Sequence, residues 1–193
     1  MKNVLQGIAI LTHPIFLPLL SLLIYAPLVA SHGEETLILA SIWFGFVYLL
    51  LPLLFFKVVR KINLANPSIT ERKSIYKAYT LVNLGFALVN VFLMTEYISF
   101  FLGAFLLHLI LWFLSFIELK ASWHTAVWSF LVTAGLMILY NYDLVGLPAM
   151  LGVACGILVL VAFTRYMQKA HTAMELIVGV ATGAITALPI LFF

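Results

Sequence analysis

Long apolar runs separated by short polar connections fill almost the whole chain. Seven of these runs have about the 20-residue length that a helix needs to cross a bilayer. They cover residues 5–30, 36–56, 78–95, 97–117, 125–142, 144–163 and 172–193. The runs lack the period-two alternation of a membrane β-barrel, and lipid offers backbone groups no other partner, so each run is predicted to be a helix. The pattern therefore predicts an all-α, polytopic transmembrane helix bundle of six to seven helices, which forms a single domain over residues 1–193.

Composition agrees with this pattern and excludes a soluble domain. Only 9% of the residues are charged, where a soluble domain has about a quarter, and the mean hydropathy is +1.18. A single cysteine, Cys155, excludes an intrachain disulfide and a cysteine metal site. If all seven runs span, each of the ten Lys and Arg residues lies on one side of the membrane. The positive-inside rule places that side in the cytoplasm.

The connection at residues 164–171 brings titratable groups to a helix start. His171 is followed four residues later by Glu175, and positions i and i+4 share a helix face. The carboxylate can therefore accept a hydrogen bond from one imidazole nitrogen and leave the other as a nucleophile or base. Arg165 precedes this pair in the same connection. The spacing predicts a held, reactive histidine.

Two further connections on the basic side carry groups that suit an anion. Lys120, Ser122 and His124 precede a predicted helix, where backbone amides and a lysine favour an anion and a histidine can act as a general acid. Arg72 and Lys77 lie in the connection at residues 57–77, and converging cations of this kind suit a phosphate. Any one of these residues could instead set the topology of the chain or cap a helix at the membrane surface, without binding a ligand.

Other polar and small residues have structural explanations. His13 precedes Pro14, which lacks a backbone donor, so the histidine is expected to cap a helix break. His108 lies in the middle of a span, where a polar side chain is either functional or hydrogen bonded to a neighbouring helix, and we favour the hydrogen bond. Two Gly-x-x-x-Gly pairs favour close helix packing within the bundle over a dimer face. They are Gly152/Gly156 and Gly179/Gly183.

The connection at residues 164–171, together with the start of the next helix, resembles a known signature. Thr164-Arg165, five residues, His171, three residues and Glu175 match in spacing the Ser-Arg-x5-His-x3-Asp signature of the type 2 phosphatidic acid phosphatase (PAP2) superfamily. Thr164 and Glu175 stand where that family has serine and aspartate, and both replacements keep the chemistry.

The other two signatures match less well. Lys120-Ala-Ser122-Trp123-His124 resembles the family's Pro-Ser-Gly-His, with Trp123 in place of the glycine that lets backbone approach phosphate. Replacing Trp123 by glycine is therefore expected to raise a weak activity. The family's Lys-x6-Arg-Pro signature is not intact, although Arg72 and Lys77 lie in the corresponding region.

The resemblance implies a metal-independent hydrolase of a lipid phosphate or diphosphate, without a cofactor. His171 would form a phosphohistidine, Glu175 would orient it, and His124 would protonate the leaving oxygen. Oxygens of the phosphate would be held by the remaining site residues, which are Arg165, Lys120, Ser122, Arg72 and Lys77. Membrane lipids are the expected partners, and no nucleic acid is expected. The resemblance also implies a monomer or homodimer in a bacterial inner membrane.

Two alternatives remain at the level of sequence. A PAP2-like protein that binds anionic lipid or phosphate without turnover would fit Trp123 and the incomplete first signature. A haem or electron-transfer membrane protein would use paired histidines, and His124 and His171 begin helices on the same side.

Overall fold

The computed structural model describes residues 2–16, 50, 53–59, 61–62, 67–93, 98–142 and 147–192, which contain helices and no strand. The elements are α1 (Lys2–Leu11), η1 (Pro14–Phe16), the π-helical η3 (Leu53–Val59), α4 (Ile69–Leu93), α5 (Ile98–Phe116), α6 (Trp123–Tyr142), α7 (Leu147–Met167), α8 (Ala173–Thr186) and η4 (Leu188–Phe192). The predicted all-α bundle is confirmed.

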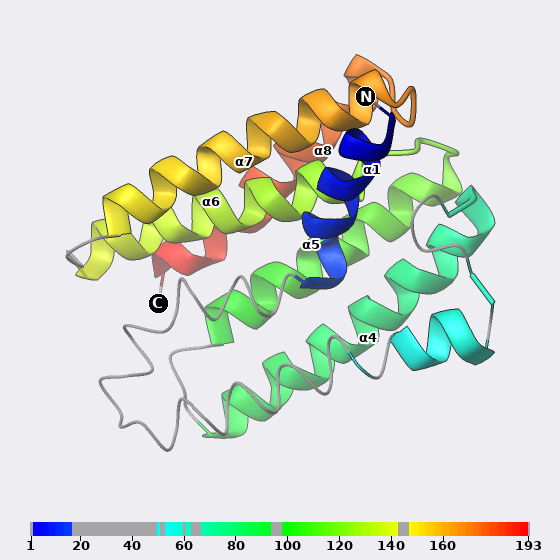
Figure 1. Cartoon of the computed structure of the whole chain (residues 1–193). Coiled ribbons are helices and arrows are strands. Elements are labelled where there is room, and N and C mark those ends of the chain that lie inside the picture. The colour runs from blue at the N-terminus through cyan, green and yellow to red at the C-terminus, as the bar shows by residue number, and fades with distance from the viewer. Residues whose placement is uncertain are drawn as a thin grey trace.

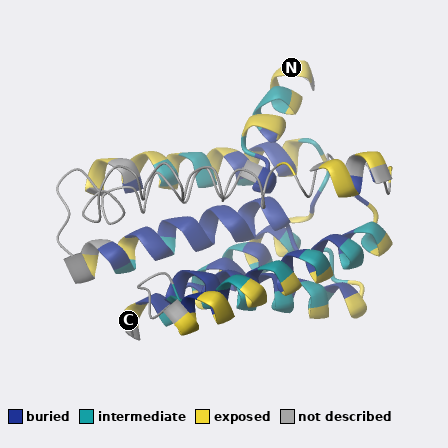
Figure 2. Ribbon diagram, turned by 90° about the horizontal axis from the view of Figure 1, so that it is seen from below, coloured by how far each residue is buried: buried dark blue, intermediate teal, exposed yellow. Residues whose placement is uncertain are grey.

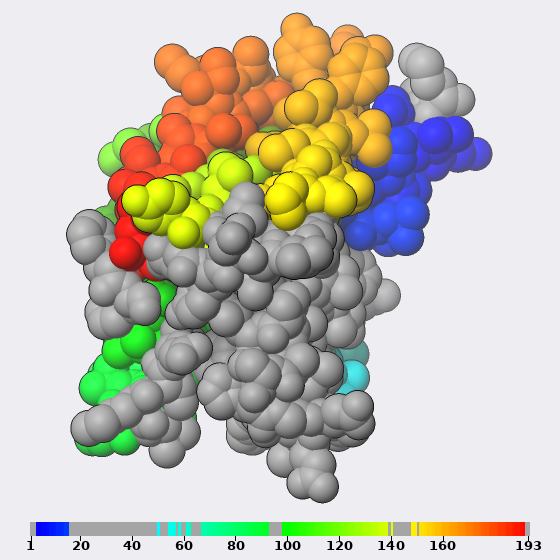
Figure 3. All heavy atoms as spheres, turned by 90° about the vertical axis from the view of Figure 1, so that its left-hand side faces the viewer, coloured from blue at the N-terminus to red at the C-terminus, as the bar shows by residue number. Residues whose placement is uncertain are grey.

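The helix α6 forms the centre of the bundle. Every residue from 121 to 132 is buried, whereas α7 is exposed along much of its length (Figure 2). Both α7 and α8 pack against α6, α4 pairs with α5, and α1 lies against α7 (Figure 1). At one end of the bundle, η4 packs against α5 and α6, and the last turns of α6 lie beside the first turns of α7 (Figure 3). The α5–α6 and α7–α8 bends lie at the opposite end (Figure 1).

Several helices have the length and apolarity of membrane spans. Three qualify among the described residues, over Ile69–Phe92, Ile98–Phe116 and Ala173–Leu191. Shorter apolar helices cover Trp123–Ile138 and Leu151–Met167. Large apolar side chains that face outward, such as Phe92 and Phe163, suit contact with lipid tails. The three qualifying helices are long and apolar enough to cross a membrane, as the hydrophobic pattern predicts.

The N-terminal prediction is corrected. Residues 5–30 are not one helix, because α1 ends at Leu11. The Thr12 hydroxyl donates back to the Ile8 carbonyl at 2.8 Å, and Pro14 has no N–H with which to continue the ladder. The short η1 follows, and the rest of this predicted segment lies outside the described residues, as does most of the segment predicted at 36–56.

The helix α4 begins at Ile69, nine residues before the predicted start at 78, because a capping box forms in front of it. The Ser68 backbone N–H donates to Glu71 Oε2 at 2.7 Å, and the Glu71 N–H donates to Ser68 Oγ at 3.3 Å. These two bonds satisfy donors that a helix start leaves open. The early start places Arg72 in the first turn of α4.

Close packing of α8 on α6 depends on glycine. A Cβ atom at Gly179 would lie 2.7 Å from the Ser122 carbonyl oxygen, and one at Gly183 would also collide with the α6 backbone. The packing role predicted for this pair is confirmed. Gly152 and Gly156 instead lie exposed on α7, with no atom of the described residues within 4 Å of an added Cβ.

Candidate functional site

Three chain segments meet at the end of the bundle that holds the α5–α6 and α7–α8 bends. Arg72 Nη1, from the first turn of α4, donates to the Ala121 carbonyl at 3.3 Å. The Ser122 N–H, at the start of α6, donates to the carbonyl of Glu175 in α8 at 3.0 Å. These bonds join three connections that are far apart in sequence, and the candidate residues lie around them.

His171 is held between two hydrogen-bond acceptors. Its Nδ1 lies 3.1 Å from the Lys120 carbonyl oxygen and 3.2 Å from Glu175 Oε2. Because a carbonyl and a carboxylate only accept, Nδ1 must carry the proton, and Nε2 keeps its lone pair. The tautomer expected from the i, i+4 spacing is therefore the one that these contacts favour.

Glu175 is fixed by the start of α8. Thr172 is the N-cap, and the two residues form a capping box in which the Thr172 N–H donates to Glu175 Oε2 at 2.9 Å. The preceding helix α7 ends at Met167, and Lys169, in the turn that follows, has a left-handed backbone (φ 53°) that reverses the chain. The chain then enters α8 with His171 directly before the cap.

The imidazole of His171 is neutral at pH 7. Burial, followed by the charges of Arg72, Arg165 and Lys120, lowers its pKa from 6.5 to about 3. Its Nε2 is buried and has no hydrogen-bond partner among the described residues. A buried nitrogen with an unused lone pair is costly unless a ligand completes it.

Arg165 brings an incompletely paired guanidinium into the same site. The residue is only 4% exposed, and its Nη1 donates to Gln168 Oε1 at 3.1 Å. Its Nε and Nη2, and the neighbouring Thr164 Oγ1, are buried without partners among the described residues. Open donors on a buried cation suit an anionic ligand, since an uncompensated buried charge is unfavourable.

The first turn of α6 supplies a second histidine. His124 is buried, and its Nε2 has no hydrogen-bond partner among the described residues. It interacts electrostatically with Arg165, His171 and Arg72. Ser122 lies before it, and its Oγ accepts the Thr125 N–H at 3.4 Å, so it caps α6.

The remaining cations divide into two groups. Arg72 is buried and braced by the Pro67 carbonyl (3.1 Å) and by the Tyr76 hydroxyl (3.3 Å). The pKa of Lys120 is lowered by partial burial and then by the charge of Arg72. Lys77 is exposed on α4, so the structure brings Arg72 and Lys120 together and leaves Lys77 outside the site.

A pocket opens beside His171 at the α7–α8 bend. It has a volume of about 650 Å³ and is lined by both polar and apolar residues. The lining residues are Lys120, Tyr166, Met167, Lys169, Ala170, His171, Thr172, Ala173 and Glu175. Two lysines and two large apolar side chains therefore border the same opening, a combination that suits a ligand with an anionic head and an apolar body.

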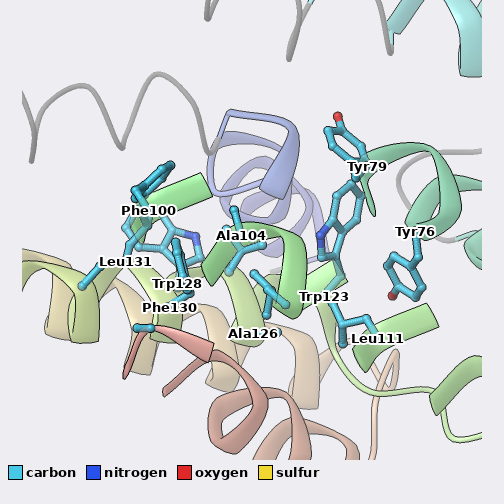
Figure 4. Packing of buried hydrophobic residues seen from close by; sticks show 14 of the residues in the cluster. Tyr76, Tyr79, Phe100, Ala104, Leu111, Trp123, Ala126, Trp128, Phe130 and Leu131 are labelled. Atoms are coloured by element: carbon cyan, nitrogen blue, oxygen red, sulfur yellow. The ribbon is translucent and has the colours of Figure 1, made fainter. Parts of the chain in front are cut away.

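The Trp123 ring lies in the hydrophobic core of the bundle. The indole packs into the core beside Tyr76 and Tyr79, with ring centroids at 5.9 and 5.5 Å (Figure 4). Its Nε1 donates to His108 Nε2 at 3.3 Å. His108 therefore has the interhelical partner that was favoured for it. Trp123 is not among the residues that line the pocket.

His13 is a site residue that sequence reasoning assigned only a local role. That role is confirmed, because His13 Nδ1 accepts the Ile15 N–H at 3.2 Å across the break. In addition, its ring lies 5.0 Å from the ring of His124 at an interplanar angle of 85°. The His-Pro pair after an apolar run signals the break in the chain but not the contact across the bundle.

Comparisons with known proteins find no matching family model, no similar curated protein and no similar solved structure. No group of three or more His, Cys, Asp or Glu side chains placed to hold a metal ion occurs in the part of the chain that the structure describes.

Proposed function

We propose that this protein is a membrane lipid phosphatase that works through a phosphohistidine on His171. The observation that carries the proposal is a set of buried nitrogens without partners among the described residues: Nε2 of His171, Nε2 of His124, and Nε and Nη2 of Arg165. A nucleophilic nitrogen, an acid and a cation left open in one site are what phosphoryl transfer requires. The spacing that resembles the PAP2 signatures supports the same reaction.

The first step is attack by His171 Nε2 on phosphorus. The new N–P bond forms as the P–O bond to the lipid breaks, and His124 gives its proton to the leaving oxygen. His124 enters this step as the imidazolium, a form that the negative charges of the bound phosphate stabilise. Glu175 and the Lys120 carbonyl hold the Nδ1 proton of His171 and stabilise the charge that develops on this ring.

The second step releases phosphate. His124, now neutral, takes a proton from water, whose oxygen attacks phosphorus as the N–P bond breaks. Inorganic phosphate leaves, and both histidines return to their starting forms. Arg165, Arg72 and Lys120 supply the positive charge that neutralises the non-bridging oxygens in both transition states.

The lipid nature of the substrate is supported by the pocket. Tyr166 and Met167 border it together with Lys120 and Lys169, and both apolar side chains are largely exposed at the end of α7. A phosphate placed at His171 would leave its lipid portion along this apolar border. Phosphatidic acid and isoprenyl diphosphate present the same anionic chemistry to the site.

The test is release of phosphate from mixed lipid phosphates by the purified protein in detergent, with a chelator present. The wild type should release phosphate and His171→Ala should release none. Lys77→Ala is the matched control, since it removes a cation that lies outside the site, and it should retain wild-type activity. A wild-type protein that releases no phosphate but still binds lipid phosphate would contradict the proposed activity and favour a protein that binds anionic lipid without turnover.

A further inference from the structure

The N-terminal segment is attached to α6 next to the candidate site. Trp128 Nε1, one turn beyond His124 in α6, donates to the Thr12 carbonyl at 3.0 Å. α1 packs against α7, and η1 packs against α6. These contacts place His13, the residue after Thr12, over the first turn of α6.

His13 touches two consecutive residues there. Its ring lies 5.0 Å from His124 and 5.6 Å from Trp123, at interplanar angles of 85° and 83°. His13 is only 7% exposed. The contact is therefore an edge-to-face packing inside the protein, the arrangement that neighbouring rings prefer.

His124 needs such a neighbour if it is to donate a proton in a fixed direction. The terminal torsion of a histidine side chain has broad minima, so the plane of its ring is weakly defined without outside contacts. His124 Nε2 has no hydrogen-bond partner among the described residues to define that plane. Packing has to define it instead.

We propose that His13 is a positioning residue whose ring fixes the orientation of the His124 imidazole for proton transfer. The inference rests on the proposed function, because it gives His13 a part in the acid step assigned to His124. His13 contacts the proposed acid, so its loss should slow the step in which the leaving oxygen takes a proton.

Two substitutions separate this role from the local cap. The side-chain oxygen of asparagine can replace Nδ1, so His13→Asn keeps an acceptor for the Ile15 N–H but removes the ring. His13→Phe keeps a ring against His124 but removes the acceptor. A positioning role predicts that Phe is better tolerated than Asn, and a purely local cap predicts the reverse order. Thr12→Val is the matched control in the same segment, since it removes only the bond from the Thr12 hydroxyl to Ile8.

The experiment measures the rate of the first step, as the release of the leaving alcohol in the first turnover, because the second step needs His124 with every substrate. The full chain in detergent is given two substrates, dioleoyl phosphatidic acid and 4-nitrophenyl phosphate. The leaving alkoxide of the lipid needs protonation, whereas 4-nitrophenolate leaves without it. With the lipid, His13→Asn should lower this rate by about 10- to 100-fold, and His13→Phe by no more than about threefold. With the aryl ester, both variants should keep this rate within about threefold of the wild type, and Thr12→Val should match the wild type with both substrates.

Other results would overturn the inference. If His13→Phe loses as much lipid activity as His13→Asn, or more, the residue acts through the local cap. If His13→Asn keeps wild-type lipid activity while His171→Ala is inactive, this inference fails and the proposed function stands. A wild type that hydrolyses neither substrate would defeat both. Monodisperse elution and an unchanged thermal midpoint check that each variant is folded.

Discussion

The Nδ1 atom of His171 lies 3.2 Å from Glu175 Oε2. The same oxygen accepts the N–H of Thr172 at 2.9 Å and so closes the capping box of α8. One carboxylate oxygen therefore stabilises a helix start and orients the proposed nucleophile. The geometry of the site is tied in this way to the folding of α8.

Replacing Glu175 should affect activity and stability by different amounts. Glu175→Ala removes the capping box, at about 1 kcal/mol, and removes the acceptor that orients His171, which should lower kcat by about 100-fold or more. Glu175→Gln retains an acceptor for both bonds and should lose about tenfold in kcat. Thermal unfolding and phosphate release measure the two effects.

The capping box of α4 provides the control for Glu175. Glu71→Ala removes the bonds that Glu71 Oε2 accepts from the Ser68 N–H and hydroxyl, each at 2.7 Å, at a residue that is not one of the candidate site residues. It should cost a similar amount of stability and leave most of the activity. Equal loss of activity in Glu71→Ala and Glu175→Ala would mean that helix capping, and not orientation of His171, explains the effect.

Arg165 should be needed for turnover and unfavourable for the stability of the empty protein. Arg165→Met removes a buried cation with two open nitrogens, so the thermal midpoint without ligand should rise or stay unchanged. The rate should fall by about 10³-fold, and the increase in thermal midpoint that inorganic phosphate gives the wild type should vanish. Lys77→Met, which removes an exposed cation, should change none of these. A large destabilisation in Arg165→Met would indicate a structural arginine instead.

The low pKa of His171 predicts a particular dependence of stability on pH. The pKa is about 3 in the folded protein and about 6.5 in an unfolded chain. Between these values the unfolded chain binds more protons, so the stability contributed by neutral His171 is present above about pH 6.5 and is lost as the pH falls toward 3. In His171→Asn the thermal midpoint should fall less over this window than in the wild type. Parallel curves for the two proteins would contradict a buried, neutral His171.

The buried position of the Trp123 ring predicts a loss of activity in Trp123→Gly, where the sequence alone suggested a gain. The ring is 4% exposed and donates to His108, so its removal leaves a cavity and an unsatisfied imidazole. Loss of about 3 kcal/mol or more of stability is expected, together with lower activity. Trp123→Phe keeps most of the ring and should cost about 1 kcal/mol through the lost hydrogen bond. Thermal midpoints and phosphate release for both variants test this, and a gain of activity in Trp123→Gly would contradict the assignment of the ring to the core.

Local sequence was sufficient for features that depend on spacing along one helix. The apolar runs predict α5 to within about one residue at each end, and the i, i+4 spacing predicts the contact of His171 with Glu175. The start of α4 was readable as well, because Ser68 and Glu71 have the spacing of a capping box. The hydrophobic pattern misplaced it because the first turns of that helix are polar.

Features that depend on contacts between distant segments were not predictable. The direction of the Trp123 side chain follows from the position of His108 on another helix, 15 residues away. The contact of His13 with His124 follows from the bond between Trp128 and Thr12 across 116 residues. Lys77 and Arg72 look equivalent in sequence, but the helix they share turns Arg72 inward and Lys77 outward.

The most direct test of the account is to trap the proposed intermediate. Wild-type protein should be mixed with phosphate-labelled lipid for a short time, quenched in base, which preserves a phosphohistidine, and mapped by peptide mass spectrometry. The account predicts phosphate on Nε2 of His171, a stronger signal in His124→Ala with an aryl phosphate, and none in His171→Ala. Turnover by the wild type without a phosphorylated histidine, or with phosphate on another residue, would contradict it.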